Sequence, residues 1–231
     1  MIISMHQPDY IPWLGYFYKI NKTDIFVFLD DVQYSNTGMH NRNQIKTPQG
    51  KCFLTVPVAY RFGDLINQCI TKDELNWKEK HLKTIEMNYK RAPHFKSFFD
   101  MFTEVISARY GNLADMNIEI NKKICEYFGI KPRFVRSSEL CINTTGTQRI
   151  IDICRLFDAD VYYSGRGAMA YQKPEMFRDN GISLVYTDYS PFAYSQLWEG
   201  FADSLSVVDY IMNHGFKWPD NKNCEIMKGY G

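Results

Sequence analysis

The chain has 231 residues, of which 27 are Lys or Arg and 26 are Asp or Glu, so its formal net charge is +1. This balance argues against a protein that holds nucleic acid by bulk electrostatic attraction. No apolar run approaches the roughly 20 residues that a membrane-spanning helix requires, and the N-terminus lacks the basic segment of a secretory signal.

The N-terminal residues predict a βαβ unit. The apolar run 1–5 predicts a first strand, Leu14 to Lys22 a short helix, and the apolar run 25–29 a second strand. A strand, a helix and a strand in succession imply a right-handed crossover and a parallel strand pair. Because the second strand is apolar throughout, we expect it to be buried on both faces.

The loop between the first strand and the helix is the most informative part of the sequence. It runs from His6 to Tyr16 and contains two prolines, which fix φ and stiffen the chain. His6 and Gln7 directly follow the strand, where side chains of open α/β proteins point into a crevice above the sheet. A titratable group on a stiff loop is typical of a preorganised site. An ordinary strand end with Trp13 and Tyr16 in the core is the alternative.

The middle of the chain predicts helices. Residues 52–58 predict a third strand and residues 65–70 a short fourth one. Apolar residues then recur at i, i+3 and i+4, which is typical of amphipathic helices. We predict a single α/β domain over residues 1–231, with a helical subdomain over residues 75–130. The three predicted helices cover residues 77–91, 95–109 and 113–128.

Strands and helices alternate again after residue 130. Thr145 or Thr147 would cap the first of these helices. The pattern as a whole predicts a mostly parallel sheet flanked by helices, with a helical insert, and a loosely held polar tail from Lys217 onward. The predicted elements are strands at 134–135, 161–163 and 184–186, and helices at 145–156 and 205–213.

Two polar clusters follow the early strands. Asp30 and Asp31 end the second strand, where carboxylates can hold a ribose, an amine or Mg²⁺, although Asp also favours simple turns. Arg42 and Lys46 stand at i, i+4 in the polar run 40–46, where both could bind a phosphate. A solvated hairpin is the alternative for that run.

A third polar cluster, Ser164, Gly165 and Gly167, follows a late strand. Glycine lets backbone N–H groups approach a phosphate closely, although a simple turn fits the same residues. Since all three clusters follow strands of a predicted parallel sheet, we expect them to converge at one edge.

The cysteines and histidines predict no metal centre. Six cysteines are scattered without a Cys-x-x-Cys pair, which excludes an ordinary zinc framework. With no export signal they are expected to be reduced thiols, and we predict a cytoplasmic protein. His81, His94 and His214 lack metal-ligand spacing and are expected to be structural.

Several motifs carry a resemblance to a known family. The sequence resembles the WbqC-like family, found in bacterial O-antigen and other surface-polysaccharide gene clusters, over nearly its whole length. The resemblance implies a transferase that attaches glycine or another acyl unit to an amino sugar. It rests on His6-Gln7-Pro8, Pro12-Trp13-Leu14-Gly15-Tyr16-Phe17, Lys19-Ile20, Leu29-Asp30-Asp31-Val32-Gln33, Asn41-Arg42-Asn43, Leu54-Thr55-Val56-Pro57-Val58 and Ser164-Gly165-Arg166-Gly167-Ala168.

A weaker likeness links the opening strand, loop and helix to the HIGH-type nucleotidylyltransferase and amide-ligase superfamily. It implies a nucleotidylyltransferase-like or Rossmann-like sheet and a loop that holds ATP phosphates. The H-x-G-H residues themselves are missing, because Pro12-Trp13-Leu14-Gly15-Tyr16 stands in their place. The cofactor therefore stays open, with ATP and Mg²⁺ as candidates.

These observations give one leading hypothesis, a transferase that forms an amide on a nucleotide-linked amino sugar. An ATP-dependent ligase or nucleotidylyltransferase is the second hypothesis, and a non-enzymatic sugar-nucleotide-binding subunit is the third. The oligomeric state stays open. The predicted catalytic residues are His6, Asp30 and Asp31. The predicted substrate-binding residues are Gln7, Tyr10, Trp13, Tyr16, Arg42, Asn43, Lys46, Ser164, Gly165 and Gly167.

Overall fold

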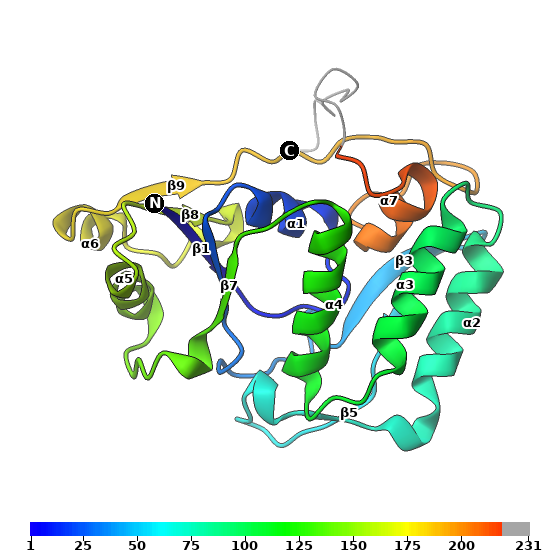
Figure 1. The fold of residues 1–231 in the computed structure, drawn as a ribbon, viewed down its shortest axis with the longest axis horizontal. Helices are drawn as coiled ribbons and strands as arrows, with labels where there is room; N and C mark the ends of the chain where they lie inside the picture. Colours follow the sequence, from blue (N-terminus) through cyan, green and yellow to red (C-terminus); the bar gives the residue numbers. More distant parts are fainter. Residues whose placement is uncertain (219–231) are drawn as a thin grey trace.

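The computed structural model describes residues 1–218. The tail that the sequence predicts to be loosely held therefore lies almost entirely outside the described residues. A parallel β-sheet occupies one end of the molecule, and three consecutive helices with a β-hairpin occupy the other (Figure 1).

The sheet has five strands in the order β7-β2-β1-β8-β9, and every neighbouring pair is parallel. Counted along the chain, this order is third, second, first, fourth and fifth, as in doubly wound folds that bind nucleotides. The predicted α/β class and the parallel sheet are confirmed. The strands are β1 (Ile2–His6), β2 (Ile25–Phe28), β7 (Arg133–Arg136), β8 (Val161–Ser164) and β9 (Ser183–Tyr186).

Helices cover both faces of the sheet. On one face, Phe26 and Phe28 of β2 pack in a core with α1 (Leu14–Asn21) and α4 (Leu113–Tyr127). On the other face, Ile25 and Val27 pack in a second core with α5 (Gly146–Leu156) and α6 (Pro174–Asp179). The chain winds outward from β1 to β2 and β7, then returns to β8 on the other side of β1. The winding direction therefore reverses between β1 and β8.

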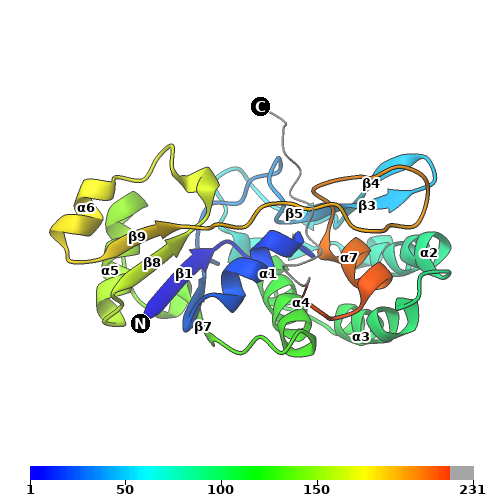
Figure 2. The ribbon, with the colours of Figure 1, turned by 90° about the horizontal axis from the view of Figure 1, so that it is seen from above.

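The remaining helices and a hairpin pack beside α4. Helices α2 (Trp77–Tyr89) and α3 (Phe95–Ser107) confirm the predicted amphipathic helices, and α3 packs between α2 and α4. After β9 the chain runs the length of the molecule to α7 (Val207–His214), which contacts α3 and the hairpin (Figure 2). The division into one domain with a helical subdomain stays a prediction.

Two short segments after β2 lie outside the main sheet. The strand predicted at 52–58 is present as β4 (Gly50–Thr55), which pairs with β3 (Arg42–Thr47) in a separate antiparallel hairpin. The segment 65–70 is mainly a 3₁₀ turn, with β6 (Ile70–Thr71) pairing with β5 (Val58–Ala59). The residues after Ser164 form a short 3₁₀ turn over Arg166–Ala168.

Among residues 1–218, five cysteines are present and all are free, while Cys224 lies outside the described part. Within the same range, no helix combines the length and the apolar character needed to cross a lipid bilayer. Thr145 is the N-cap residue of α5, as predicted, but its side chain makes no capping bond.

Candidate functional site

Two cavities open at the carboxyl ends of β1 and β8. The larger, of about 440 Å³, lies between these strand ends and the start of α5, and the smaller, of about 300 Å³, lies beside α1. Both are at the reversal of strand order, where open α/β sheets bind their ligands. Four residues line both cavities and form the junction between them: His6, Lys19, Gly165 and Gly167.

His6 ends β1 and faces the cavities with a side chain that is 36% exposed. Its Nδ1 lies 3.1 Å from the backbone oxygen of Gln7 and donates to it, since a carbonyl only accepts. The other ring nitrogen, Nε2, is then an acceptor. Withdrawal from bulk water and the neighbouring Lys19 lower the pKa of His6 to about 4. The imidazole is therefore neutral at physiological pH.

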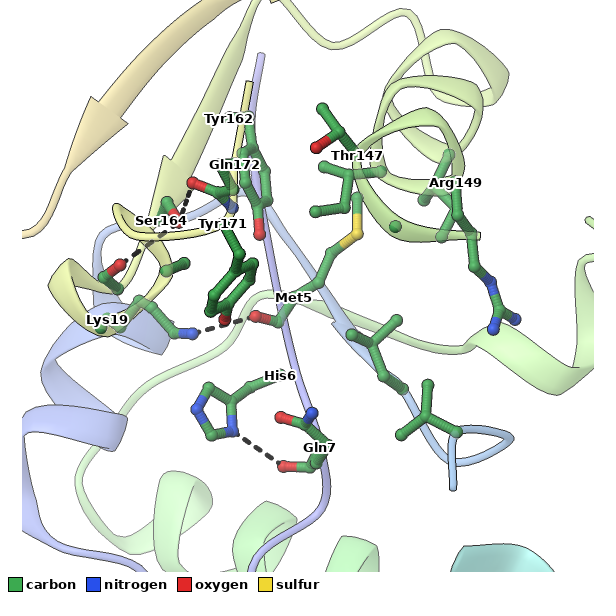
Figure 3. Close-up of a pocket in the computed structure, with 18 residues that line it drawn as sticks. Met5, His6, Gln7, Lys19, Thr147, Arg149, Tyr162, Ser164, Tyr171 and Gln172 are labelled. Atoms are coloured by element: carbon green, nitrogen blue, oxygen red, sulfur yellow. Dashed lines mark hydrogen bonds between the residues drawn. The ribbon is translucent and has the colours of Figure 1, made fainter. Parts of the chain in front are cut away.

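Lys19 is the junction residue to which the sequence analysis assigned no role. It lies on α1, its side chain is turned toward the sheet, and it is only 4% exposed. Its Nζ donates to the backbone oxygen of Met5 at 2.9 Å. Burial lowers the pKa of Lys19 to about 7, partly offset by Asp9. Figure 3 shows Lys19 and His6 on one side of the larger cavity, opposite Thr147 and Arg149.

The loop that follows His6 is fixed by donors to its backbone oxygens. Asn117 and Asn121 on α4 donate to the oxygens of Pro8 and Asp9. Tyr16 Oη donates to the oxygen of residue 7, and Asn43 Nδ2 donates to those of residues 10 and 11. Ser206 Oγ also donates to the oxygen of residue 11, and the backbone N–H of Val207 donates to that of residue 12. Every backbone oxygen from residue 7 to residue 12 is therefore held.

Two features show how strongly this loop is constrained. Ile11 has a φ of +38°, which is rare for a β-branched residue and requires support from its surroundings. Asp9 accepts a hydrogen bond from His40 at 2.9 Å, and its other oxygen lies 3.7 Å from Nδ1 of His6. The carboxylate thus lies between the two histidines.

The wall of the smaller cavity is aromatic. Trp13, whose side chain packs edge-on against Tyr189, is 41% exposed, and Tyr16 packs edge-on against His6. Gly15 lies directly beneath the Trp13 ring, because a Cβ there would come within 2.4 Å of it. The sequence predicted a site role for Trp13 and Tyr16, and both line this cavity.

The larger cavity has a polar rim. Gln7 and Ser164 line it as predicted residues, and Ser164 donates to the side-chain oxygen of Gln172 at 3.0 Å. Gly146 and Thr147, at the N-terminus of α5, line the opposite side. No described Asp or Glu lines either cavity.

The structure does not bring Asp30 and Asp31 into either cavity. Asp30 is 1% exposed, and its carboxylate accepts hydrogen bonds from the backbone and side chain of Ser138. Asp31 pairs with Arg149 at 2.6 Å and accepts a bond from Ser137. Both carboxylates therefore hold the segment after β7, and neither lines the cavity that His6 lines.

The polar run 40–46 also lies away from the cavities, on β3 and just before it. Arg42 donates to the backbone oxygen of Thr37 and stacks on Phe53. Lys46 is buried and donates to backbone oxygens of Trp198 and Gly200. These side chains anchor loops, so the expected convergence with His6 is absent.

Two more of the predicted substrate-binding residues, Asn43 and Tyr10, make structural contacts. Asn43 supports the loop after β1, as described above. Tyr10 is fully buried, and its hydroxyl donates to Nδ1 of His81, whose Nε2 donates to the backbone oxygen of Thr55. Within residues 1–218, no group of three His, Cys, Asp or Glu side chains is placed to hold a metal ion.

Comparison with known proteins agrees with the motifs. The model of the WbqC-like protein family matches residues 7–220. The chain is also 34% identical to the uncharacterized protein Rv1507c of Mycobacterium tuberculosis, over 94% of this chain and 96% of that protein. No solved structure matched it. Residues 7–16 of the opening loop, three of the four junction residues and nearly the whole fold lie inside the matched range, and the chain belongs to the WbqC-like protein family.

Proposed function

We propose that the chain is a transferase of surface-polysaccharide biosynthesis that joins an acyl unit, such as glycyl, to the amine of a nucleotide-linked amino sugar. One observation carries this proposal: two cavities meet at His6 and Lys19. A transferase needs two substrates side by side, with a proton acceptor between them. The aromatic wall of the smaller cavity suits a sugar ring, and the polar rim of the larger one suits phosphates.

In this reaction the amine nitrogen attacks the acyl carbonyl carbon, and the bond from that carbon to the leaving group breaks. The amine gives up a proton in the process. Neutral His6 accepts it at Nε2 and returns it to the departing group, since Nδ1 is bonded to Gln7. Asp9, 3.7 Å from Nδ1, stabilises the transient imidazolium. We place the reaction in the cytoplasm, where the free thiols stay reduced.

The test is an assay of amide formation by mass spectrometry, with nucleotide-linked amino sugars and activated acyl donors as substrates. We expect His6→Ala to lower turnover by about 10²–10⁴-fold, because a general base is lost. Added imidazole should restore part of the rate. His94→Ala is the matched control, since His94 lines neither cavity. A rate near wild type in His6→Ala would remove His6 from the mechanism.

The strand order and the α5 N-terminus at the larger cavity favour a second candidate, an ATP-using ligase or nucleotidylyltransferase. The Gly165 to Gly167 turn on the other side would hold the phosphates in that case. A ligase or nucleotidylyltransferase would release phosphate or pyrophosphate and would require ATP and Mg²⁺, whereas simple acyl transfer would release neither. Saturable binding without any product would instead favour a sugar-nucleotide-binding subunit.

A further inference from the structure

The Lys19 ammonium is the least satisfied charged group at the junction. It has three N–H donors. Within residues 1–218, one donates to the backbone oxygen of Met5, and Nζ also lies 5.8 Å from the centroid of the Phe26 ring, a cation–π contact. None of the described carboxylates lies within ion-pair distance of it. A buried cation without an anionic partner is costly. The site therefore lacks a negative group at this position.

The surroundings of Lys19 favour an anion from outside the protein. The charged and titratable groups around it include His6 and Asp9 from the opening loop, Tyr16 from its own helix and Arg166 from the turn after β8. Tyr162, Tyr171 and Arg149 line the larger cavity with it. Asp9 is already bonded to His40. The chain as a whole has nearly as many acidic as basic residues. The absence of Asp and Glu among the described lining residues is therefore a local property of these cavities.

Lys19 also changes charge easily near neutral pH. Burial holds the pKa of its ammonium at about 7, so the neutral amine and the ammonium coexist. An anion in contact with Nζ favours the charged form, and its arrival draws a proton from solution. His6 is neutral through this range and takes no part in the uptake.

We propose that Lys19 binds a phosphate oxygen of the nucleotide-linked substrate at the junction of the two cavities. This inference rests on the proposed function for the identity of the ligand. The N–H groups at the α5 N-terminus and the Gly165 to Gly167 turn face the same space and add donors.

The test is calorimetry with uridine diphosphate at pH 8 in two buffers of different ionisation enthalpy. The phosphate is fully ionised there, so uptake reports the protein. We expect uptake of about 0.9 proton for a group of this pKa, and an affinity that falls by about tenfold per pH unit above pH 7. Glycerol phosphate, a phosphomonoester without the nucleoside and with a second pKa of about 6, should show the same uptake with weaker binding. Uptake with uridine diphosphate alone would contradict a phosphate contact.

Two variants separate charge from proton uptake. Lys19→Arg keeps the charge at every pH, so we expect binding without uptake and without the fall above pH 7. Lys19→Met should weaken binding by about 10–100-fold at pH 7, because a charge-assisted bond is lost. Lys22→Met, an exposed position at the end of the same helix, is the control that should match wild type. Thermal melting of each variant checks the fold.

Wild-type affinity and full uptake in Lys19→Met would overturn the inference. That outcome is distinguishable from failure of the proposed function. If no amide forms with any substrate while Lys19-dependent uptake persists, the transferase proposal fails and the phosphate contact stands. If amide forms with an unchanged KM in Lys19→Met, the phosphate contact fails alone.

Discussion

At the scale of single residues, Lys19 opposes folding because its charge is buried. The unfolded chain binds a proton at Lys19 up to about pH 10.5, whereas the native protein releases it near pH 7. The contribution of Lys19 to stability is therefore most favourable above pH 10.5 and is lost as the pH falls from 10.5 to 7. We expect Lys19→Met to raise the free energy of unfolding by about 2 kcal/mol at pH 7, after the lost bond to Met5 is deducted.

Urea unfolding at pH 7 and pH 10 measures this effect. The gain should shrink toward pH 10, where wild-type Lys19 is neutral in the native state and less of the penalty remains. A variant that is destabilised equally at both pH values would show that the bond to Met5 outweighs the buried charge.

Gly15 and Trp13 make a second residue-scale prediction. Alanine at position 15 would place its Cβ within 2.4 Å of the Trp13 ring, so the ring must leave its place in the smaller cavity. We expect Gly15→Ala to cost about 1–3 kcal/mol and to raise the KM of the ligand in that cavity. In the double variant Gly15→Ala/Trp13→Ala, the clash is absent, so Gly15→Ala should add no further loss of stability, although the KM stays raised. If the losses of the two single variants simply add in the double variant, the clash is contradicted.

At the scale of elements, α4 positions the opening loop through buried amides. Asn117 Nδ2 donates to the backbone oxygens of Pro8 and His40 at 2.8 and 2.7 Å. Asn117→Ala leaves both oxygens without this donor, and we expect a loss of about 2–4 kcal/mol in the free energy of unfolding. Asn88→Ala is the control, because Asn88 bonds only one carbonyl within its own helix. Chemical denaturation of the two variants compares them, and equal losses would contradict a special role for Asn117.

Elements with a clear period were predictable from the sequence, and β3 was not. The strands of the sheet are short apolar runs, and α2 to α4 carry regular apolar spacing, so both kinds were found. β3 reads Arg-Asn-Gln-Ile-Lys-Thr, which is typical of an exposed turn. Asn43 and Lys46 are nevertheless buried, because partners far away in the chain satisfy them. Local patterns carry no information about such partners.

At the scale of the whole molecule, the lack of information about distant partners also explains which site residues the sequence could predict. The residues directly after β1 and β8 reach the cavities, because strand order alone brings them there. Asp31 does not line them: Arg149, which is 118 positions later in the chain and itself lines the larger cavity, holds its carboxylate. Lys19 was overlooked because a lysine in a helix is usually exposed; its signal was its place among buried neighbours on α1.

Acid stability of the whole protein depends on two neutral histidines. Burial lowers the pKa of both His6 and His81 to about 4, so the unfolded chain binds these protons first and stability falls between pH 6.5 and pH 4. His81, which is 6% exposed, accounts for a loss of about 3 kcal/mol in the free energy of unfolding over this pH range. The loss that His6 causes is smaller, because its side chain is partly exposed to solvent.

We therefore expect urea unfolding of His81→Asn to lose less stability between pH 7.5 and pH 4.5 than wild type loses. His94→Asn serves as the comparison and should follow wild type. The same pH dependence in His81→Asn and wild type would show that His81 is protonated in the native state.

The backbone oxygens of residues 7–12 are held from α1, β3, α4 and the start of α7, which lie far apart in the sequence. Grafting the His6–Trp13 segment into another parallel sheet would therefore not reproduce the cavities, because the recipient would lack these donors. The smallest transplantable unit includes the asparagines of α4 and β3 together with Ser206. Directed evolution of new substrate preference should accordingly vary Tyr171 and Gln172, which line the larger cavity, and leave residues 7–12 unchanged.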